Sequence, residues 1–223
     1  MINLNKLIVI EGCGDGVGKS TQFLLLRDQL IKDGYVVQTH HFPSYGEYHA
    51  KGVEEYLQGN LGELKDLSPY FINNVYAHDR AVAWYKYLKK SYDNGDTILL
   101  DRYVTSSLIY QTANMTCESD KKSFIDYIMD YEYSKLGLKE PDQVLFLHAP
   151  HKLLDELLRK RIHNDGVFND IHERQKDYLE RVYETSMFIA DYLHWEKIDC
   201  STDGKLRSIH DIHKDVYSKV MKK

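Results

Sequence analysis

No apolar run in this chain of 223 residues approaches the roughly 20 residues that a membrane-spanning helix needs. Residues 1–11 contain no long apolar segment followed by a cleavage site, so we expect no secretory signal peptide. Positive charge is not in excess, because 29 Lys and Arg stand against 34 Asp and Glu, and a net charge of −5 gives no general attraction for nucleic acid. We therefore expect a protein that binds neither a membrane nor nucleic acid.

Cysteine is scarce as well. Cys13, Cys117 and Cys200 are far apart and odd in number, which favours a reducing, cytoplasmic location over a disulfide framework. The 11 histidines are scattered, and none of their groupings comes with the further ligands that a structural metal site requires. Hydrophobic residues (43%) and charged residues (28%) occur in ordinary amounts, and there is no internal repeat or linker, so one globular domain over residues 1–223 is expected.

Residues 7–21 carry the strongest motif, Leu-Ile-Val-Ile-Glu-Gly-Cys-Gly-Asp-Gly-Val-Gly-Lys-Ser-Thr. The apolar start predicts a short strand that is buried on both faces of a parallel sheet, and an amphipathic helical pattern follows the motif. Phosphate-binding loops have this order of elements: a strand, a glycine-rich loop, Lys-Ser and a helix. The residues predicted to bind the phosphates are Gly12, Cys13, Gly14, Asp15, Gly16, Val17, Gly18, Lys19, Ser20 and Thr21.

In such a loop the backbone amides point inward at an anion, and the amino end of the following helix adds a positive field. Lys19 would reach the β- and γ-phosphates, and the Ser20 hydroxyl would hold Mg2+. The usual pattern has a glycine five positions before Gly18, where this sequence has Cys13. Either Gly12 takes that role in a loop one residue longer, or Cys13 occupies the first turn position. A glycine-rich turn without a ligand is the alternative, and the other matches disfavour it.

Further short apolar runs alternate with helical patterns along the chain. Strands are predicted at residues 7–10, 35–42, 97–100, 143–147 and 196–199. Helices are predicted near residues 50–57, 68–92, 121–136, 151–162, 172–194 and 204–221, and directly after the phosphate loop and after residue 103. This alternation predicts an α/β fold with a parallel sheet, in which ligands bind at the carboxyl ends of the strands.

Charged residues stand at the end of the third predicted strand. Asp101 closes an apolar run, where burial of a carboxylate is costly, and we expect it to bind Mg2+, directly or through water, and to face Ser20. The alternative is that Asp101 caps the helix that begins near Tyr103. Arg102, and Arg80 on the preceding long helix, are suited to bidentate phosphate contacts, with surface ion pairing as the alternative.

A basic cluster that includes Arg159 and Arg161 precedes a polar stretch with a glycine. It suggests a lid, at about residues 159–173, that brings cations onto a transferring phosphoryl group, although a solvated helix end would look similar. Three aromatic side chains could enclose or stack on a base, while aromatic residues on helices belong more often to the core. They are Phe42, Tyr76 and Tyr110.

Several motifs occur together between residues 6 and 200: Glu-Gly followed by Asp-Gly-x-Gly-Lys-Ser-Thr-Gln, Phe42-Pro43, Tyr-Ala-His-Asp-Arg at 76–80, Asp-Arg-Tyr at 101–103, Ser-Ser-x-x-Tyr-Gln at 106–111 and Asp-x-His-Glu at 170–173. This combination resembles thymidylate kinase, a family of nucleoside-monophosphate kinases. The resemblance implies a P-loop NTPase-type three-layer α/β/α fold with a five-stranded parallel sheet and a helical lid, usually as a homodimer. It also implies transfer of the γ-phosphoryl group of ATP to dTMP, giving dTDP and ADP with Mg2+.

The resemblance also suggests roles for individual residues. Arg102 would hold the acceptor phosphate, Tyr76 would stack on thymine, and Arg80 would read the base edge together with Gln111. Gly16 stands where some members carry a catalytic arginine, and members with glycine at this position supply the cation from the lid instead. The catalytic residues expected on this basis are Lys19, Arg102, Asp15, Arg159 and Arg161. Those expected to bind dTMP are Asp15 at the sugar 3′-hydroxyl, Phe42, Tyr76, Arg80, Arg102, Ser106, Ser107, Tyr110 near the sugar, and Gln111.

Other functions remain open at the level of the sequence. The acceptor could be another nucleoside monophosphate or a deoxynucleoside. A nucleotide-dependent switch would need a guanine-reading Asn-Lys-x-Asp motif after a strand, whereas Asn5-Lys6-Leu7-Ile8 lacks the Asp and precedes the first strand. A non-catalytic nucleotide-binding protein is the remaining alternative, and it differs from a kinase in forming no phosphorylated product.

Overall fold

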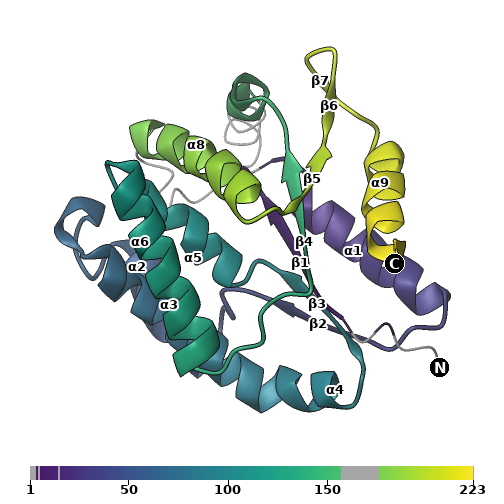
Figure 1. The fold of residues 1–223 in the computed structure, drawn as a ribbon, viewed down its shortest axis with the longest axis horizontal. Helices are drawn as coiled ribbons and strands as arrows, with labels where there is room; N and C mark the ends of the chain where they lie inside the picture. Colours follow the sequence, from purple (N-terminus) through teal and green to yellow (C-terminus); the bar gives the residue numbers. More distant parts are fainter. Residues whose placement is uncertain (1–3, 5, 15, 157–175, 223) are drawn as a thin grey trace.

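A parallel sheet forms the middle of the molecule (Figure 1). The computed structural model describes residues 4, 6–14, 16–156 and 176–222. Within these residues the sheet has five strands in the order β2-β3-β1-β4-β5, and all neighbouring strands are parallel. The strands are β1 (Leu7–Gly12), β2 (Val37–His41), β3 (Thr97–Asp101), β4 (Gln143–His148) and β5 (Glu196–Asp199), followed by a hairpin of β6 (Ser201–Thr202) and β7 (Lys205–Leu206).

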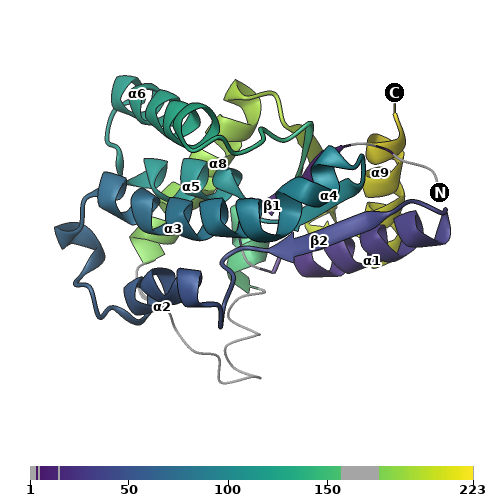
Figure 2. The same cartoon turned by 90° about the horizontal axis from the view of Figure 1, so that it is seen from below.

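Helices cover both faces of the sheet. α1 and α9 lie on one face, and α3, α5, α6 and α8 lie on the other (Figures 1 and 2). The helices are α1 (Lys19–Lys32), η1 (Tyr48–Ala50), α2 (Lys51–Gln58), η2 (Leu64–Asp66), α3 (Pro69–Ala83), η3 (Trp84–Leu88), α4 (Lys89–Asp93), α5 (Val104–Tyr110), η4 (Thr112–Asn114), α6 (Glu118–Met129), η5 (Asp130–Lys135), α8 (Lys176–Tyr192) and α9 (Ile209–Met221). η3 and η5 are π-helical and continue α3 and α6 without a break.

The two central strands explain why this sequence forms a three-layer core. All residues of β1 and β3 are buried, and the apolar side chains of Leu7–Ile10 have no exposed surface. A parallel strand with helices on both faces has no side open to water, so its residues are apolar without alternation. Burial of these runs, at about 25 cal/mol per Å² of apolar surface, favours the placement of both strands in the interior of the sheet.

The register of the strands places several polar residues at one edge. Ile10 lies opposite Asp101, and Asp101 lies opposite His41 on its other side. Gly12 lies opposite Leu147. The phosphate loop after β1, the end of β2 and the end of β3 therefore meet at the carboxyl edge of the sheet, which is where α/β folds bind ligands.

The predicted α/β fold with a five-stranded parallel sheet is confirmed, and the long helix predicted at 68–92 corresponds to α3, η3 and α4 in succession. The predicted start of the last helix, residue 204, was wrong. Residues 201–206 form the β6–β7 hairpin, and α9 begins only at Ile209. An Asp-Gly turn at 203–204, with positive φ at both residues, makes the hairpin possible and excludes a helix there.

The predicted lid, residues 159–173, lies outside the described residues. Of the helix predicted at 151–162, residues 151–156 are described and helical. In the described parts of the chain, no helix is both long and apolar enough to cross a membrane.

Candidate active site

The phosphate loop leads from β1 into α1. Gly18, the residue before the helix, has a φ of 98°, and Gly16 has a φ of 83°. Glycine adopts these left-handed angles without steric cost, so the loop can turn sharply and present its amides at the amino end of α1. Lys19 is buried, and its Nζ donates to the Gly14 carbonyl at 3.2 Å. The lysine thus lies folded over the loop that would receive the phosphates.

Gly12 takes the role of the first loop glycine. A Cβ atom at this position would come within 2.8 Å of Val17 Cγ1 and 3.0 Å of Lys19 Cδ, so a side chain here would force Val17 or Lys19 to move. Cys13 instead turns its buried thiol toward the Ala149 carbonyl, and burial raises the pKa of this thiol to about 11. The loop is therefore one residue longer than the usual pattern, and Cys13 is part of the core beneath it.

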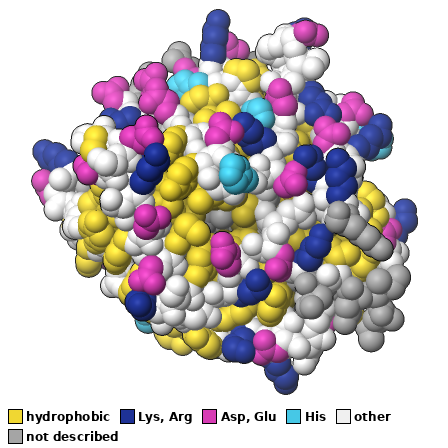
Figure 3. Space-filling model, in the orientation of Figure 1, with side chains coloured by type: hydrophobic (Ala, Val, Ile, Leu, Met, Phe, Trp, Pro, Cys, Tyr) yellow, Lys and Arg dark blue, Asp and Glu magenta, His cyan; other side chains and the backbone are white. Residues whose placement is uncertain are grey.

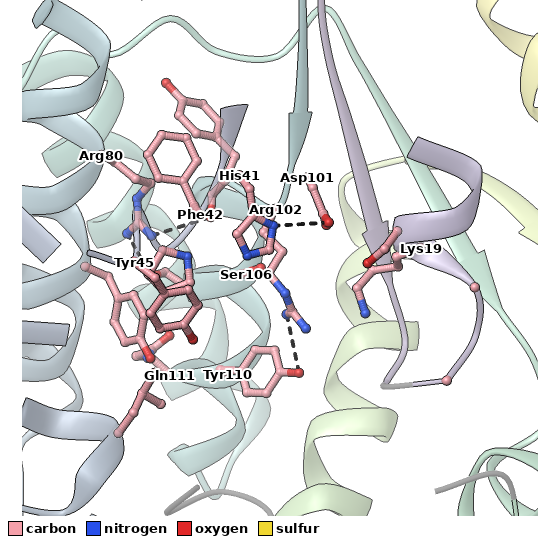
Figure 4. Close-up of a pocket in the computed structure, with 18 of the residues that line it drawn as sticks. Lys19, His41, Phe42, Tyr45, Arg80, Asp101, Arg102, Ser106, Tyr110 and Gln111 are labelled. Carbon is pink, nitrogen blue, oxygen red and sulfur yellow. Dashed lines mark hydrogen bonds and ion pairs between the residues drawn. The ribbon is translucent and has the colours of Figure 1, made fainter. Parts of the chain in front are cut away.

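A cavity of about 530 Å³ opens beside this loop at the carboxyl edge of the sheet. The Lys19 ammonium and the Arg102 guanidinium are turned toward the same space within it (Figure 4). The residues that line the cavity are Gly16, Gly18, Lys19, Ser20, Thr21, His41, Phe42, Pro43, Tyr45, Leu57, Tyr76, Arg80, Asp101, Arg102, Tyr103, Ser106, Ser107, Tyr110, Gln111 and Leu179. A volume of this size suits one nucleotide-sized ligand.

Arg102 has an unusual backbone. Its φ is 65°, in the left-handed region that non-glycine residues rarely adopt, and strain of this kind is concentrated at functional sites. Its amide donates to the Ile10 carbonyl at 3.1 Å, which ties the end of β3 to β1. The guanidinium lies 5.6 Å from the centre of the Tyr110 ring, and Nη1 donates to the Tyr110 hydroxyl at 3.5 Å. The turned backbone thus directs a cation into the cavity.

Asp101 is not a helix cap, so that alternative is wrong: α5 begins at Val104 after Tyr103, with no side-chain cap. Asp101 Oδ2 lies 3.2 Å from Nδ1 of His41, while Oδ1 is buried and has no hydrogen-bond partner among the described residues. Burial raises the pKa of this carboxyl, but the hydrogen bond and charge of His41 outweigh it and hold the pKa below its usual value.

An ionised carboxylate with an unused oxygen is a suitable ligand for Mg2+. Ser20 lines the same cavity, so Asp101 and Ser20 could hold the ion together with nucleotide phosphates. Within the described ranges, no group of three or more His, Cys, Asp and Glu could hold a metal by itself. The donor set therefore fits a Mg2+ ion that also has nucleotide phosphates among its ligands.

The deep end of the cavity contains side chains suited to a base. Arg80 is buried in an ion pair with Glu132, with distances of 2.6 and 2.7 Å, instead of lying at the surface. Gln111 is buried, and its Oε1 has no partner among the described residues. Tyr76 is half-buried and lines the cavity, with its ring 6.0 Å from that of Tyr56. Aromatic, amide and guanidinium groups thus converge there.

The other predicted acceptor residues also meet at this cavity. Phe42, Ser106, Ser107 and Tyr110 all contribute to its lining. The peptide bond between Phe42 and Pro43 is cis. Three predicted site residues lie outside the described residues: Asp15, Arg159 and Arg161.

The family model for thymidylate kinase matches residues 10–212. The chain belongs to the thymidylate kinase family. A thymidylate kinase from Brachyspira hyodysenteriae is 35% identical over 206 residues, which cover 90% of this chain and 88% of the relative. A thymidylate kinase from Mycobacterium tuberculosis (strain ATCC 25618 / H37Rv) is 34% identical over 179 residues, covering 78% of this chain and 81% of the relative.

A solved thymidylate kinase from Candida albicans has the same fold, with a TM-score of 0.71 at 22% identity, and the match covers 96% of this chain and 90% of that one. The predictions of a thymidylate kinase, of the P-loop α/β fold and of ATP-dependent phosphorylation of dTMP to dTDP are confirmed by the family.

The site also contains buried residues to which the sequence analysis gave no role, although Glu11 and Asp79 stand within the motifs that it quotes. Glu11 has no exposed surface, and its Oε2 accepts hydrogen bonds from Thr105 at 2.9 Å and Ser106 at 2.6 Å. Its Oε1 lies 3.9 Å from Nη1 of Arg102. The cost of burying a charge at the end of an apolar strand, which singled out Asp101, also applies to Glu11 and could have identified it.

The turn after β2 is held by a second buried group. Asp79 Oδ2 accepts from the Ser44 amide at 3.0 Å, and its Oδ1 lies 2.7 Å from Nδ1 of His49. Asp79 and His49 are both buried. This pair fixes the turn that carries Phe42 and Tyr45 to the cavity wall. Asp79 belongs to the Tyr-Ala-His-Asp-Arg motif at 76–80, but His49 is 30 residues away in the sequence, so no local pattern reveals the pair.

Proposed function

We propose that the chain transfers the γ-phosphoryl group of ATP to dTMP with the ATP phosphates in the glycine loop and dTMP in the cavity of about 530 Å³. The observation that supports this most directly is the placement of Lys19 and Arg102, which come from different strand ends and line one cavity. One cation suits the donor phosphates and the other the acceptor phosphate. Two anionic nucleotides can then meet end to end between them.

The acceptor would lie with its phosphate at Arg102 and its base at the deep end of the cavity. Tyr76 would stack on thymine, while Arg80 and Gln111 would contact the base edge. Stacking on an aromatic face and hydrogen bonds to ring carbonyls and ring N–H groups are the contacts that recognise a pyrimidine. Phe42, Ser106, Ser107 and Tyr110 would enclose the rest of the nucleotide, and Asp15 would contact the sugar 3′-hydroxyl.

Catalysis in this arrangement needs alignment and neutralisation of charge rather than a general base. The acceptor phosphate is already anionic near neutral pH, so no proton has to be removed before it attacks. Lys19 would draw negative charge from the β- and γ-phosphates, Arg102 would fix the attacking oxygen, and Arg159 and Arg161 would add lid cations. Ser20 and Asp101 would hold Mg2+, which neutralises phosphate charge when it is bound.

We also propose that the protein is cytoplasmic and forms a homodimer. The scarcity and spacing of cysteines support a cytoplasmic location, and Cys13, Cys117 and Cys200 are free thiols. A homodimer is supported by exposed apolar side chains on α3, including Tyr70 (46% exposed) and Phe71 (45%). Hydrophobic side chains gather on the side of the molecule that carries α6, the neighbour of α3 (Figure 3).

An acceptor panel tests the substrate. ADP release should be fastest with dTMP when dTMP, dUMP, dCMP, dGMP and thymidine are compared at equal concentration with ATP and Mg2+. Faster turnover of a different acceptor would assign a different kinase activity, and absence of any dTDP would identify a non-catalytic nucleotide-binding protein.

Two variants test the shared cavity. Lys19→Met and Arg102→Ala should each lower kcat/KM for dTMP by about 100-fold or more, the loss expected on removal of one transition-state donor. Lys32→Met and Arg27→Ala, on the outer surface of α1, are the matched controls and should keep near wild-type activity. Near-normal activity of both Lys19→Met and Arg102→Ala would refute the placement of the two nucleotides.

A further inference from the structure

The cavity floor contains a buried ion pair between two helices on the same face of the sheet. Arg80 comes from α3, and Glu132 comes from the π-helical segment η5 that continues α6. Their side chains are 2% and 0% exposed. Arg80 Nε donates to Glu132 Oε2 at 2.6 Å, and Nη2 donates to Oε1 at 2.7 Å. The pair is therefore bidentate and almost completely buried.

The hydrogen-bond count shows which part of the guanidinium is left for a ligand. An arginine has five N–H donors. Glu132 takes the Nε–H and one N–H of Nη2, and the Ser107 hydroxyl accepts from Nη2 at 2.8 Å. Nη1 has one long partner among the described residues, the Tyr103 carbonyl at 3.5 Å. Because Arg80 lines the cavity, Nη1 is the atom with a donor left for an acceptor base.

Stability alone does not account for this pair. Burial lowers the pKa of Arg80, but the charge and hydrogen bonds of Glu132 outweigh it and hold the pKa above its ordinary value, so the guanidinium stays ionised. A buried ion pair is often no more stabilising than apolar residues of the same volume. What a bidentate carboxylate adds is direction, since it fixes the plane and the rotation of the guanidinium.

We propose that Glu132 is a positioning residue that sets acceptor specificity by turning Nη1 of Arg80 toward the base as a donor. A donor in that place pairs with a ring carbonyl, as in thymine or uracil, and opposes the amino group that cytosine presents at the corresponding position. Two facing donors leave a buried polar group unpaired, which a closed site rejects strongly. The inference rests on the proposed placement of the acceptor base against Arg80.

Steady-state kinetics of Glu132 variants with dTMP, dUMP and dCMP test the proposed role of Glu132. Glu132→Gln keeps the shape of the side chain but loses the charge and one acceptor, and Glu132→Asp keeps the charge but withdraws it by one methylene. Each should raise KM for dTMP about tenfold or more, the scale for a hydrogen bond to a charged group, with KM for ATP unchanged and kcat within about threefold. If Glu132→Gln proves too unstable to purify, the kinetic comparison is made with Glu132→Asp alone.

Base selectivity separates positioning from loosening of the fold. The ratio of kcat/KM for dTMP over dCMP should fall in both variants, while the ratio for dTMP over dUMP should stay constant, because thymine and uracil present the same carbonyl. General loosening of the site would change both ratios.

A double-mutant cycle shows whether Glu132 acts through Arg80. In an Arg80→Met background, Glu132→Gln should cause no further loss of kcat/KM for dTMP. Additive losses, or an unchanged KM for dTMP in folded Glu132 variants, would overturn the proposal. If Arg80→Met itself left dTMP binding unchanged, the proposed placement of the base would fail instead, so the two failures are distinguishable.

Discussion

Two buried glutamates stand behind the two arginines of the cavity. Glu132 forms a bidentate pair with Arg80, and Glu11 lies 3.9 Å from Arg102 while it accepts hydrogen bonds from two hydroxyls. A cation that must remain charged in a partly closed site needs a counter-charge, and a carboxylate removed from water needs donors. Each arginine of the cavity thus has a buried carboxylate of the protein on one side.

The thiols provide a prediction at the residue scale. Burial raises the pKa of Cys13 to about 11 and that of Cys200 to about 12, whereas Cys117 is exposed. The thiolate is the reactive form, so at pH 8 roughly one Cys13 in a thousand is ionised, and raising the pH toward 11 should increase its reactivity. A chromogenic disulfide reagent at pH 8 should therefore modify one thiol per native chain.

The Cys117→Ser variant is the control for that measurement. It should react slowly at pH 8 and release all its remaining thiols on denaturation. Fast modification of native Cys117→Ser would show that the thiol under the phosphate loop is accessible, contrary to its position in the core.

At the residue scale, the sequence analysis identified residues that belong to motifs but did not identify the buried residues that form hydrogen bonds and ion pairs with them. The positions of Lys19, Asp101 and Arg102 at one cavity were predictable because Lys19 follows the glycine-rich loop, and Asp101 and Arg102 come directly after the apolar run at 97–100. Glu132 was not, because it lies 52 positions from Arg80 in an ordinary-looking helical segment. The partner of a charged residue is known only from the folded structure when the two are far apart in the sequence. Buried hydrogen-bond and ion-pair partners are therefore less predictable than the residues that line a site.

At the scale of elements, α9 has a defined start that the sequence analysis placed too early. Ser208 has an extended backbone, and its hydroxyl accepts from the Asp211 amide at 3.1 Å and donates to the Asp211 carboxylate at 2.7 Å. Ser followed three residues later by an acidic residue is a recognisable helix start, and it outweighs the helical pattern that seemed to begin at 204. The helices that begin at a proline or after the glycine loop were placed well because those signals are local.

Removal of this cap should lower stability without changing catalysis. Ser208→Ala leaves the Asp211 amide without its acceptor and should cost about 1 kcal/mol of the free energy of unfolding, or roughly 2–4 °C in melting temperature. Activity should stay constant, because α9 packs on α1 and β5 away from the cavity. The measurement is thermal unfolding followed by circular dichroism.

The matched control is Ser218→Ala, an exposed position inside the same helix. It should leave stability unchanged or raise it slightly, because alanine is the better helix former. Equal melting temperatures for Ser208→Ala and Ser218→Ala would show that the cap contributes nothing measurable.

At the scale of the whole molecule, the sheet order follows from a few strong signals. The two strands whose residues are all buried, β1 and β3, are neighbours in the interior, and β2 and β5 lie at the edges with partly exposed residues. The alternation of strands and helices predicted this class of fold, but the packing of α3 against α6 involves residues far apart in the chain. Contacts of that kind depend on side-chain shape and are not encoded in local periodicity.

One surface of the described structure has the character of an interface. Tyr70 of α3 packs against Phe124 and Tyr127 of α6 with ring centres 4.7 Å apart in both cases, and Tyr127 stacks on Tyr131 at 5.7 Å. Phe71 lies beside Tyr70 and is 45% exposed. Contiguous exposed aromatic residues are unusual on a monomer, and a two-fold axis through such a surface would bury it against its own copy.

The proposed homodimer can be tested at this surface with Phe71→Glu. A charge placed at the centre of an apolar interface would lose its hydration without gaining a partner, so the mass measured by light scattering should fall from two chains to one. Ile31→Glu is the control: Ile31 is 52% exposed on α1, on the opposite face of the sheet, and its variant should remain a dimer. A wild-type protein with the mass of one chain would refute the dimer, and a Phe71→Glu variant that stays dimeric would move the interface to another surface.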